Sequence, residues 1–146
     1  MARIEGRLKV GIPADLAFDL WSRPEEFANF MGCVIDVQDQ GKDVYKITTE
    51  TPGGTEVWTV KLQRESPRSV RWRSVEGGRF LGEVTLRTSY DGTEIMLAVD
   101  YEPQTKSVQT ETRRMVIPTW DVGGDLLRFR MYAEGVLEDQ EVEALA

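Results

Sequence analysis

Histidine is absent from this chain of 146 residues, and cysteine occurs only once, as Cys33. The absence of histidine excludes Ser-His-Asp and Cys-His catalytic groups, as well as zinc or iron sites with histidine ligands. A single cysteine excludes an internal disulfide, and we expect Cys33 to be a small buried apolar side chain. Any acid–base chemistry would depend on Asp, Glu, Tyr or Lys, or on water held by Arg, Ser or Thr.

Long apolar runs are also missing from the sequence. No stretch reaches the roughly 18 apolar residues that a membrane span requires, and the N-terminal residues lack the apolar segment of a secretory signal. We therefore expect a cytoplasmic protein. No phosphate-binding loop, dinucleotide glycine fingerprint or metal-ligand cluster occurs, so the sequence implies neither a cofactor nor a metal.

Positive charge is in short supply. The chain has 18 Lys and Arg against 25 Asp and Glu, which gives a net charge of −7. Nucleic acid is therefore not an expected partner, because phosphate binding needs a concentrated positive field. One basic run surrounds Trp72, and it fits the solvated outer face of a strand better than a nucleic-acid surface: Arg64, Arg68, Arg71, Arg73 and Arg79.

The middle of the chain consists of extended runs separated by turn-forming residues. Apolar and polar residues alternate along these runs, as in strands with one covered face and one wet face. We therefore predict an antiparallel meander, with a type I′ turn at Asp91-Gly92 and two less regular strands near 32–39 and 43–50. The turn positions are Gln40-Gly41, Pro52-Gly53-Gly54, Ser66-Pro67, Gly77-Gly78 and Asp91-Gly92.

Helices are predicted on both sides of the meander. A first strand at about 2–11 precedes two short helices, which begin near Pro13 and Pro24. A long helix is expected over about 119–136, with Thr119 as its N-cap and an acidic, frayed tail. Its inward face is predicted from helical spacing, with Leu126, Arg130 and Ala133 flanking it: Trp120, Gly123, Leu127 and Met131.

The expected order is thus strand, two short helices, six strands and a long helix. Only the last helix is long enough to cover the apolar face of the sheet. The chain has no repeats, linkers or low-complexity segments, so we expect one domain over 1–146. The predicted fold class is α+β, a helix-grip in which a curved antiparallel seven-stranded sheet wraps around the long C-terminal helix.

The pattern resembles the SRPBCC superfamily (START or Bet v 1-like helix-grip fold), and within it the bacterial polyketide cyclase/dehydrase-like group. The resemblance covers nearly the whole chain and contains no short catalytic signature; Ala28 departs from the proline usual in the group. It rests on Phe18-Asp19-Leu20-Trp21, Phe27-Ala28-Asn29-Phe30-Met31, Val34, Val37, Trp58, Arg71-Trp72-Arg73-Ser74, Glu76-Gly77, Gly82-Glu83-Val84, Thr93, Leu97, Tyr101-Glu102-Pro103 and Asp125-Leu126-Leu127-Arg128-Phe129-Arg130.

The resemblance implies a ligand-binding cavity between the sheet and the long helix. Ser74 could hydrogen-bond a ligand or a neighbouring backbone group, and Tyr101 could donate a proton or orient a carbonyl. Arg130 could pair with Glu76, receive an anionic ligand group or extend to solvent at the helix edge. The cavity candidates are Phe30, Met31, Trp58, Trp72, Ser74, Phe80, Tyr101, Trp120, Leu127 and Arg130.

Relatives that share this fold differ in their tasks, and the fold alone does not choose among them. The leading hypothesis is binding of a hydrophobic small molecule or lipid in the cavity. The alternative is an enzyme of the polyketide cyclase/dehydrase (aromatase) type, and a third possibility is a regulatory or partner-binding domain. The absence of histidine and of a clear inward carboxylate weighs against the enzyme. Either a monomer or a homodimer is compatible with the sequence.

Overall fold

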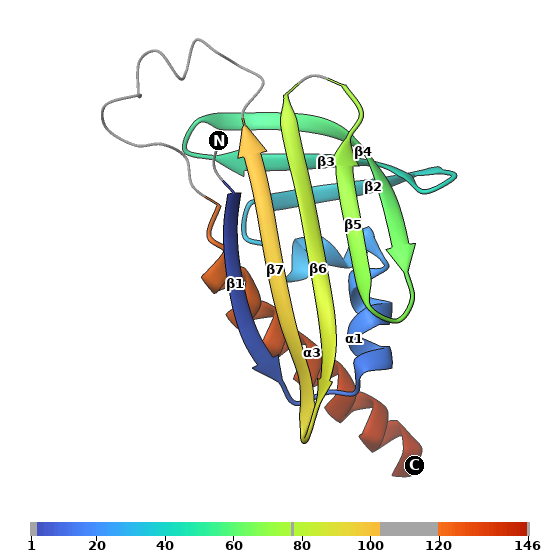
Figure 1. Cartoon of the computed structure of the whole chain (residues 1–146). Helices are drawn as coiled ribbons and strands as arrows, with labels where there is room; N and C mark the ends of the chain where they lie inside the picture. The colour runs from blue at the N-terminus through green and yellow to red at the C-terminus, as the bar shows by residue number, and fades with distance from the viewer. Residues whose placement is uncertain (1–2, 77, 103–119, 146) are drawn as a thin grey trace.

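The computed structural model describes residues 3–76, 78–102 and 120–145 of the chain (Figure 1). The predicted order of elements is confirmed, with strand ends shifted by one or two residues. The elements are β1 (Arg3–Val10), α1 (Ala14–Trp21), the 3₁₀ helix η1 (Pro24–Asn29), β2 (Val34–Gly41), β3 (Val44–Thr51), β4 (Gly54–Glu65), β5 (Ser69–Ser74), β6 (Arg79–Ser89), β7 (Gly92–Glu102) and α3 (Val122–Leu145).

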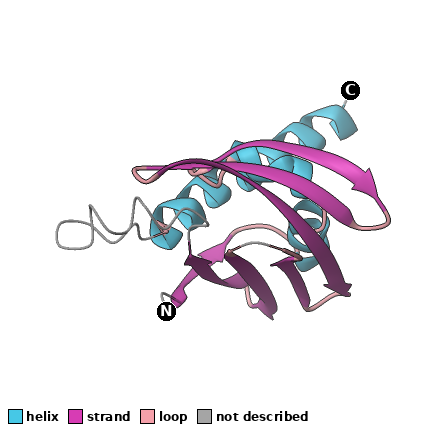
Figure 2. Ribbon diagram, turned by 90° about the horizontal axis from the view of Figure 1, so that it is seen from above, coloured by secondary structure: helices cyan, strands magenta, loops and turns pink. Residues whose placement is uncertain are grey.

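All seven strands form one antiparallel sheet with the order β1-β7-β6-β5-β4-β3-β2. The first strand pairs with the last, in a register that runs from Arg3 opposite Asp100 to Val10 opposite Thr93. The sheet curves strongly, with α3, α1 and η1 held on its concave side (Figures 1 and 2). This arrangement confirms the predicted helix-grip fold.

The tight hairpin turns differ from the prediction in detail. The left-handed backbone of a type I′ turn occurs at Lys42 and Asp43, with φ of 55° and 64°, between β2 and β3. The β6–β7 hairpin instead closes with Ser89 opposite Gly92, so its turn lies one residue earlier than predicted. The predicted hairpin at Asp91-Gly92 is therefore confirmed, but the prediction of a type I′ turn at this dipeptide is wrong.

Helix α1 is held to the sheet by its buried face and by a contact at its C-terminal end. Ala17, Leu20 and Trp21 of α1 are buried against the strands. At the C-terminal end of α1, the Arg64 guanidinium of β4 donates two hydrogen bonds, of 2.8 and 3.1 Å, to the carbonyl oxygen of Ser22. These bonds satisfy a helix-end carbonyl that would otherwise lack a partner.

The last helix begins and ends later than predicted. It starts at Val122, where the Asp121 carboxylate accepts a hydrogen bond of 3.0 Å from the Gly124 amide and so acts as the N-cap. The predicted cap, Thr119, lies outside the described residues. The acidic C-terminal stretch, predicted to fray, is helical as far as Leu145.

The predicted inward face of α3 is wrong by part of a turn. Leu127 and Met131 are exposed, and the side chains that face the sheet are Val122, Leu126, Phe129 and Ala133. The helix packs on β1 and β7. It comes close because Gly6 of β1 has no side chain: a Cβ there would lie 2.9 Å from Val122 Cγ1. No helix in the described ranges combines the length and apolar character needed to cross a membrane.

Candidate functional site

The buried core between the sheet and the helices contains a continuous series of aromatic rings. Successive centroids lie 4.8–6.1 Å apart in tilted or edge-to-face contacts, the geometries that aromatic pairs favour. Phe27 and Trp72, 5.0 Å apart, join the helical half of the series to the half on the sheet. The members are Trp21, Phe27, Phe30, Phe129, Tyr132, Trp72, Phe80, Trp58, Tyr101 and Trp120.

Six of the predicted cavity residues belong to this series, and their side chains are all buried. They are Phe30, Trp58, Trp72, Phe80, Tyr101 and Trp120. Met31, which follows η1, is fully buried in the same core. The predicted inward orientation of these side chains is confirmed, because large apolar residues at alternate strand positions all point to the buried face of the sheet.

A small polar group lies within the aromatic surface. The Trp58 indole Nε1 donates a hydrogen bond of 3.0 Å to Thr49 Oγ1, and the hydroxyls of Thr49 and Tyr101 are 3.1 Å apart. Burial raises the pKa of Tyr101, so its hydroxyl stays neutral and can donate a hydrogen bond. The sequence analysis did not single out Thr49, although the alternation that placed Tyr45 and Ile47 inward also extends to it.

A buried carboxylate, Asp125 on α3, forms a second polar group. Asp125 accepts hydrogen bonds from Trp120 Nε1 at 2.6 Å, from the Gly32 amide at 2.9 Å and from Arg128 at 2.6 Å. Arg128 also donates to the Phe30 carbonyl at 2.9 Å. Burial raises the pKa of Asp125, although the three hydrogen bonds act in the opposite direction. The statement that no carboxylate points inward is therefore wrong.

Two indole N–H groups of the interior have no hydrogen-bond acceptor within the part of the chain that the structure describes. They belong to Trp21 and Trp72, whose rings lie on either side of Phe27, at centroid distances of 5.8 and 5.0 Å. Buried donors in folded proteins are normally paired, with protein, water or ligand. Within the described residues, these two buried N–H groups are exceptions to that rule.

Three predicted site residues do not join this inner surface. The Ser74 hydroxyl donates to the Gly78 carbonyl at 3.0 Å and accepts from the Phe80 amide at 3.1 Å, so it closes the β5–β6 connection. Leu127 is 49% exposed. Arg130 is half-buried at the edge of the buried face of α3, and it makes no ion pair with Glu76.

The comparisons with known proteins agree with this architecture. Residues 10–129 match the family model described as "Polyketide cyclase / dehydrase and lipid transport". The chain belongs to this family. A similar curated protein, from Streptomyces lincolnensis, is 26% identical over 137 residues, which are 92% of this chain and 91% of the relative. It is described as an uncharacterized 17.2 kDa protein in the melC2-rnhH intergenic region.

Several solved structures share the fold of this polyketide cyclase/dehydrase family member. DR_A0006 from Deinococcus radiodurans superposes with a TM-score of 0.71 at 22% identity, covering 90% of this chain and 95% of the other. The Zhui aromatase/cyclase from Streptomyces sp. R1128 gives 0.66 at 18% identity, with 93% of each chain covered. A START superfamily protein from Mycobacterium smegmatis gives 0.66 at 9% identity, covering 93% and 99%. The SRPBCC resemblance is thereby confirmed for the fold.

Proposed function

We propose that this protein binds a hydrophobic small molecule that contains a carbonyl or hydroxyl oxygen, in the interior between the sheet and α3. The observation that carries the proposal is the Thr49–Tyr101–Trp58 polar group, enclosed by aromatic rings. Ligand sites in proteins typically combine apolar walls with a few polar groups that fix the ligand's orientation. The family description, which includes lipid transport, points in the same direction.

The rings and the polar group have separate roles in this proposal. Phe80, Trp58 and Trp120 offer aromatic faces and edges to an apolar or aromatic ligand body. The neutral Tyr101 hydroxyl donates a hydrogen bond to the ligand oxygen, and Thr49 holds that hydroxyl in place. The N–H of Trp72 has no acceptor among the described residues and is a further donor near Phe80, whose ring lies 6.0 Å from that of Trp72.

Native mass spectrometry of the protein purified from its own cells, followed by solvent extraction, tests the proposal. We expect a co-purifying hydrophobic species, and its affinity should fall about 2- to 10-fold in Tyr101→Phe, since one hydrogen bond is worth roughly 0.5–1.5 kcal/mol. Tyr90→Phe is the matched control, because Tyr90 is fully exposed at a hairpin tip. A ligand-free mass, together with equal affinities of both variants for hydrophobic probes, would contradict the proposal.

A polyketide cyclase/dehydrase reaction is the second candidate. It is favoured by the buried Tyr101 hydroxyl, which could stabilise an enolate formed on a bound poly-β-ketone by hydrogen-bonding its oxygen. The shared fold of the Zhui aromatase/cyclase adds an analogy. Incubation with a poly-β-ketone substrate, followed by mass analysis for loss of water, tests this activity. Turnover that Tyr101→Phe abolishes and Tyr90→Phe retains would support it, and the absence of any turnover would reject it.

A further inference from the structure

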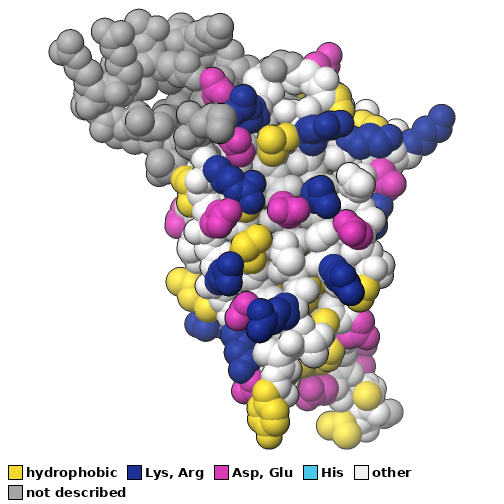
Figure 3. Space-filling view, viewed as in Figure 1, with side chains coloured by type: hydrophobic (Ala, Val, Ile, Leu, Met, Phe, Trp, Pro, Cys, Tyr) yellow, Lys and Arg dark blue, Asp and Glu magenta, His cyan; other side chains and the backbone are white. Residues whose placement is uncertain are grey.

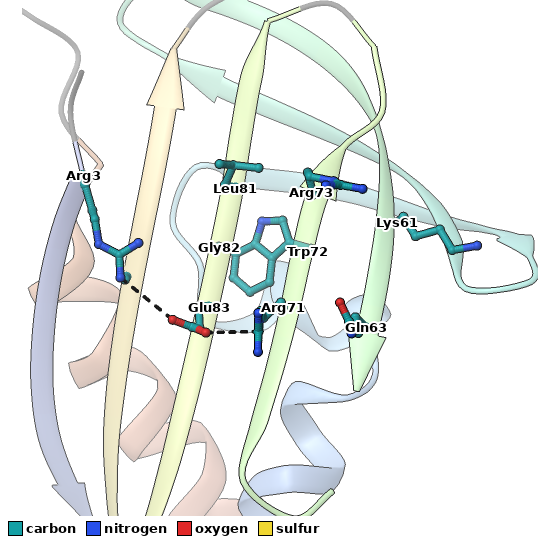
Figure 4. Close-up of a pocket in the computed structure, with 10 residues that line it drawn as sticks. Arg3, Lys61, Gln63, Arg71, Trp72, Arg73, Leu81, Gly82 and Glu83 are labelled. Carbon is teal, nitrogen blue, oxygen red and sulfur yellow. Dashed lines mark ion pairs between the residues drawn. The ribbon is translucent and has the colours of Figure 1, made fainter. Parts of the chain in front are cut away.

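The convex face of the sheet, opposite the aromatic interior, contains a pocket of about 340 Å³. Lys and Arg side chains are prominent on this face in Figure 3, with acidic residues among them. Four cationic side chains and one carboxylate line the pocket, and Figure 4 shows them on β1, β4, β5 and β6: Arg3, Lys61, Arg71, Arg73 and Glu83. The pocket lining therefore has four cations against one carboxylate, on a chain whose net charge is −7.

Nearby carboxylates form ion pairs with only some of these cationic side chains. Glu83 pairs with Arg71 at 3.1 Å and with Arg3 at 3.9 Å. Lys61 and Arg73, by contrast, form no ion pair with any carboxylate among residues 3–76, 78–102 and 120–145. Two of the four cations are therefore available to an anion from outside.

Lys61 and Arg73 are also direct cross-strand neighbours, since the register of β4 and β5 places them opposite each other. Like charges directly opposite in a sheet repel and lower stability. An anion bound between the two side chains would replace this repulsion with two attractive, charge-assisted contacts. The Lys61–Arg73 pairing therefore lowers the stability of the anion-free protein and favours the protein with an anion bound.

The base of the pocket adds an apolar surface beside the charges. Leu81 lies directly opposite Arg73 on the next strand, and Ala98 of β7 lines the same hollow. Gly82 leaves room for the Trp72 indole, which lies across it: a Cβ at Gly82 would be 1.9 Å from Trp72 Cζ2. The pocket can thus accommodate carbon atoms next to an anionic group, and Trp72 borders both the pocket and the interior.

We propose that this outer pocket binds a small molecule through an oxyanion, phosphate or carboxylate, held between Lys61 and Arg73. This site is separate from the proposed interior binding site, so a negative result for one proposal would not affect the other. Arg71, fixed by Glu83 and by Glu65 at 3.3 Å, borders the anion position. The carbon part of the ligand rests on Leu81 and Ala98.

An NMR titration of ¹⁵N-labelled protein with inorganic phosphate, and separately with acetate, tests the site at ionic strength held constant with sodium chloride. We expect saturable shifts of the amides near Lys61 and Arg73. Saturation with phosphate alone would identify a phosphate site, and saturation with acetate as well would identify a general oxyanion site. Shifts that grow without saturation, or that spread over all exposed cations, would overturn the proposal.

Matched double variants make the test specific. Lys61→Gln combined with Arg73→Gln should weaken phosphate binding at least 10-fold. Lys46→Gln combined with Arg7→Gln removes two exposed cations outside the pocket and should leave the affinity unchanged. The pocket variant should also have a higher melting temperature in chloride alone, because it lacks the like-charge pair. Equal phosphate affinity in both double variants would refute the assignment.

Discussion

Gly82 is the residue that allows the Trp72 indole to lie flat against the sheet. A Cβ at this position would be 1.9 and 2.1 Å from two indole carbons, which is far inside contact distance. We predict that Gly82→Ala lowers the free energy of unfolding by about 1–3 kcal/mol, the usual cost of overpacking a core. Urea unfolding followed by tryptophan fluorescence measures the effect.

Gly135→Ala is the control for that substitution. Gly135 lies inside α3, and a Cβ there would have no neighbour within 4 Å. Alanine in a helix interior is favoured over glycine by roughly 0.5–1 kcal/mol, so this variant should be more stable than the parent. If both variants shifted stability in the same direction, the steric explanation for Gly82 would be wrong.

Tyr101 should make the free energy of unfolding decrease at alkaline pH. Burial raises the pKa of Tyr101 above that of the unfolded chain, which is about 10. The folded state therefore holds its proton more tightly, and this contribution is complete below pH 10 and is lost as the pH rises above it. The free-energy difference between the parent and Tyr101→Phe, measured by urea unfolding, should shrink as the pH rises above about 10. A constant difference over this range would contradict the assignment.

Helix α3 depends on Asp125 for its attachment to the rest of the molecule. The carboxylate joins the helix to the chain after η1 through the Gly32 amide, and it also binds Trp120 and Arg128. Asp125→Leu leaves these donors without an acceptor, so we predict a loss on the order of 2–4 kcal/mol in unfolding free energy. Asp19→Asn, which breaks only the exposed pair with Arg23, should cost less than about 0.5 kcal/mol. If thermal unfolding showed that Asp125→Leu and Asp19→Asn lower stability by similar amounts, this account would be contradicted.

The position of α3 was predictable from sequence, but the face it buries was not. Two sets of apolar residues with helical spacing run along the segment. The prediction assumed that Trp120 was part of the helix, and this favoured the set that contains Leu127. The helix begins after Trp120, at Val122, and this shift brings Phe129 inward. Asp125 was missed because a carboxylate in the first turn of a helix usually faces solvent, and its three donors are distant in sequence or come from the turn itself.

At the scale of the whole molecule, the sheet was the part most open to prediction. Each strand has one apolar face to bury and the turn residues separate the strands, so the number of strands and the meander from β2 to β7 follow from local pattern. The pairing of β1 with β7 does not. The outer pocket could not be predicted in this way. It arises where Lys61, Arg73 and Leu81 come into one row across three strands, which depends on the exact register.

The aromatic series should make the described core unfold as one unit. Its rings come from α1, η1, α3 and the strands β4 to β7, so no element can leave without exposing another's rings. We predict that far-ultraviolet circular dichroism and tryptophan fluorescence report the same urea midpoint. Two separated transitions would show that the helical half of the series unfolds independently.

The pairing of β1 with β7 also affects how the chain is synthesised. β1 is synthesised before the other strands of this sheet, yet β7, the strand it pairs with among the described residues, ends at Glu102. At roughly 5–20 residues per second, β1 must wait about 5–20 s with both edges unpaired before β7 follows. During translation β1 is thus an open strand with alternating apolar residues, a segment that a chaperone could recognise before the sheet closes.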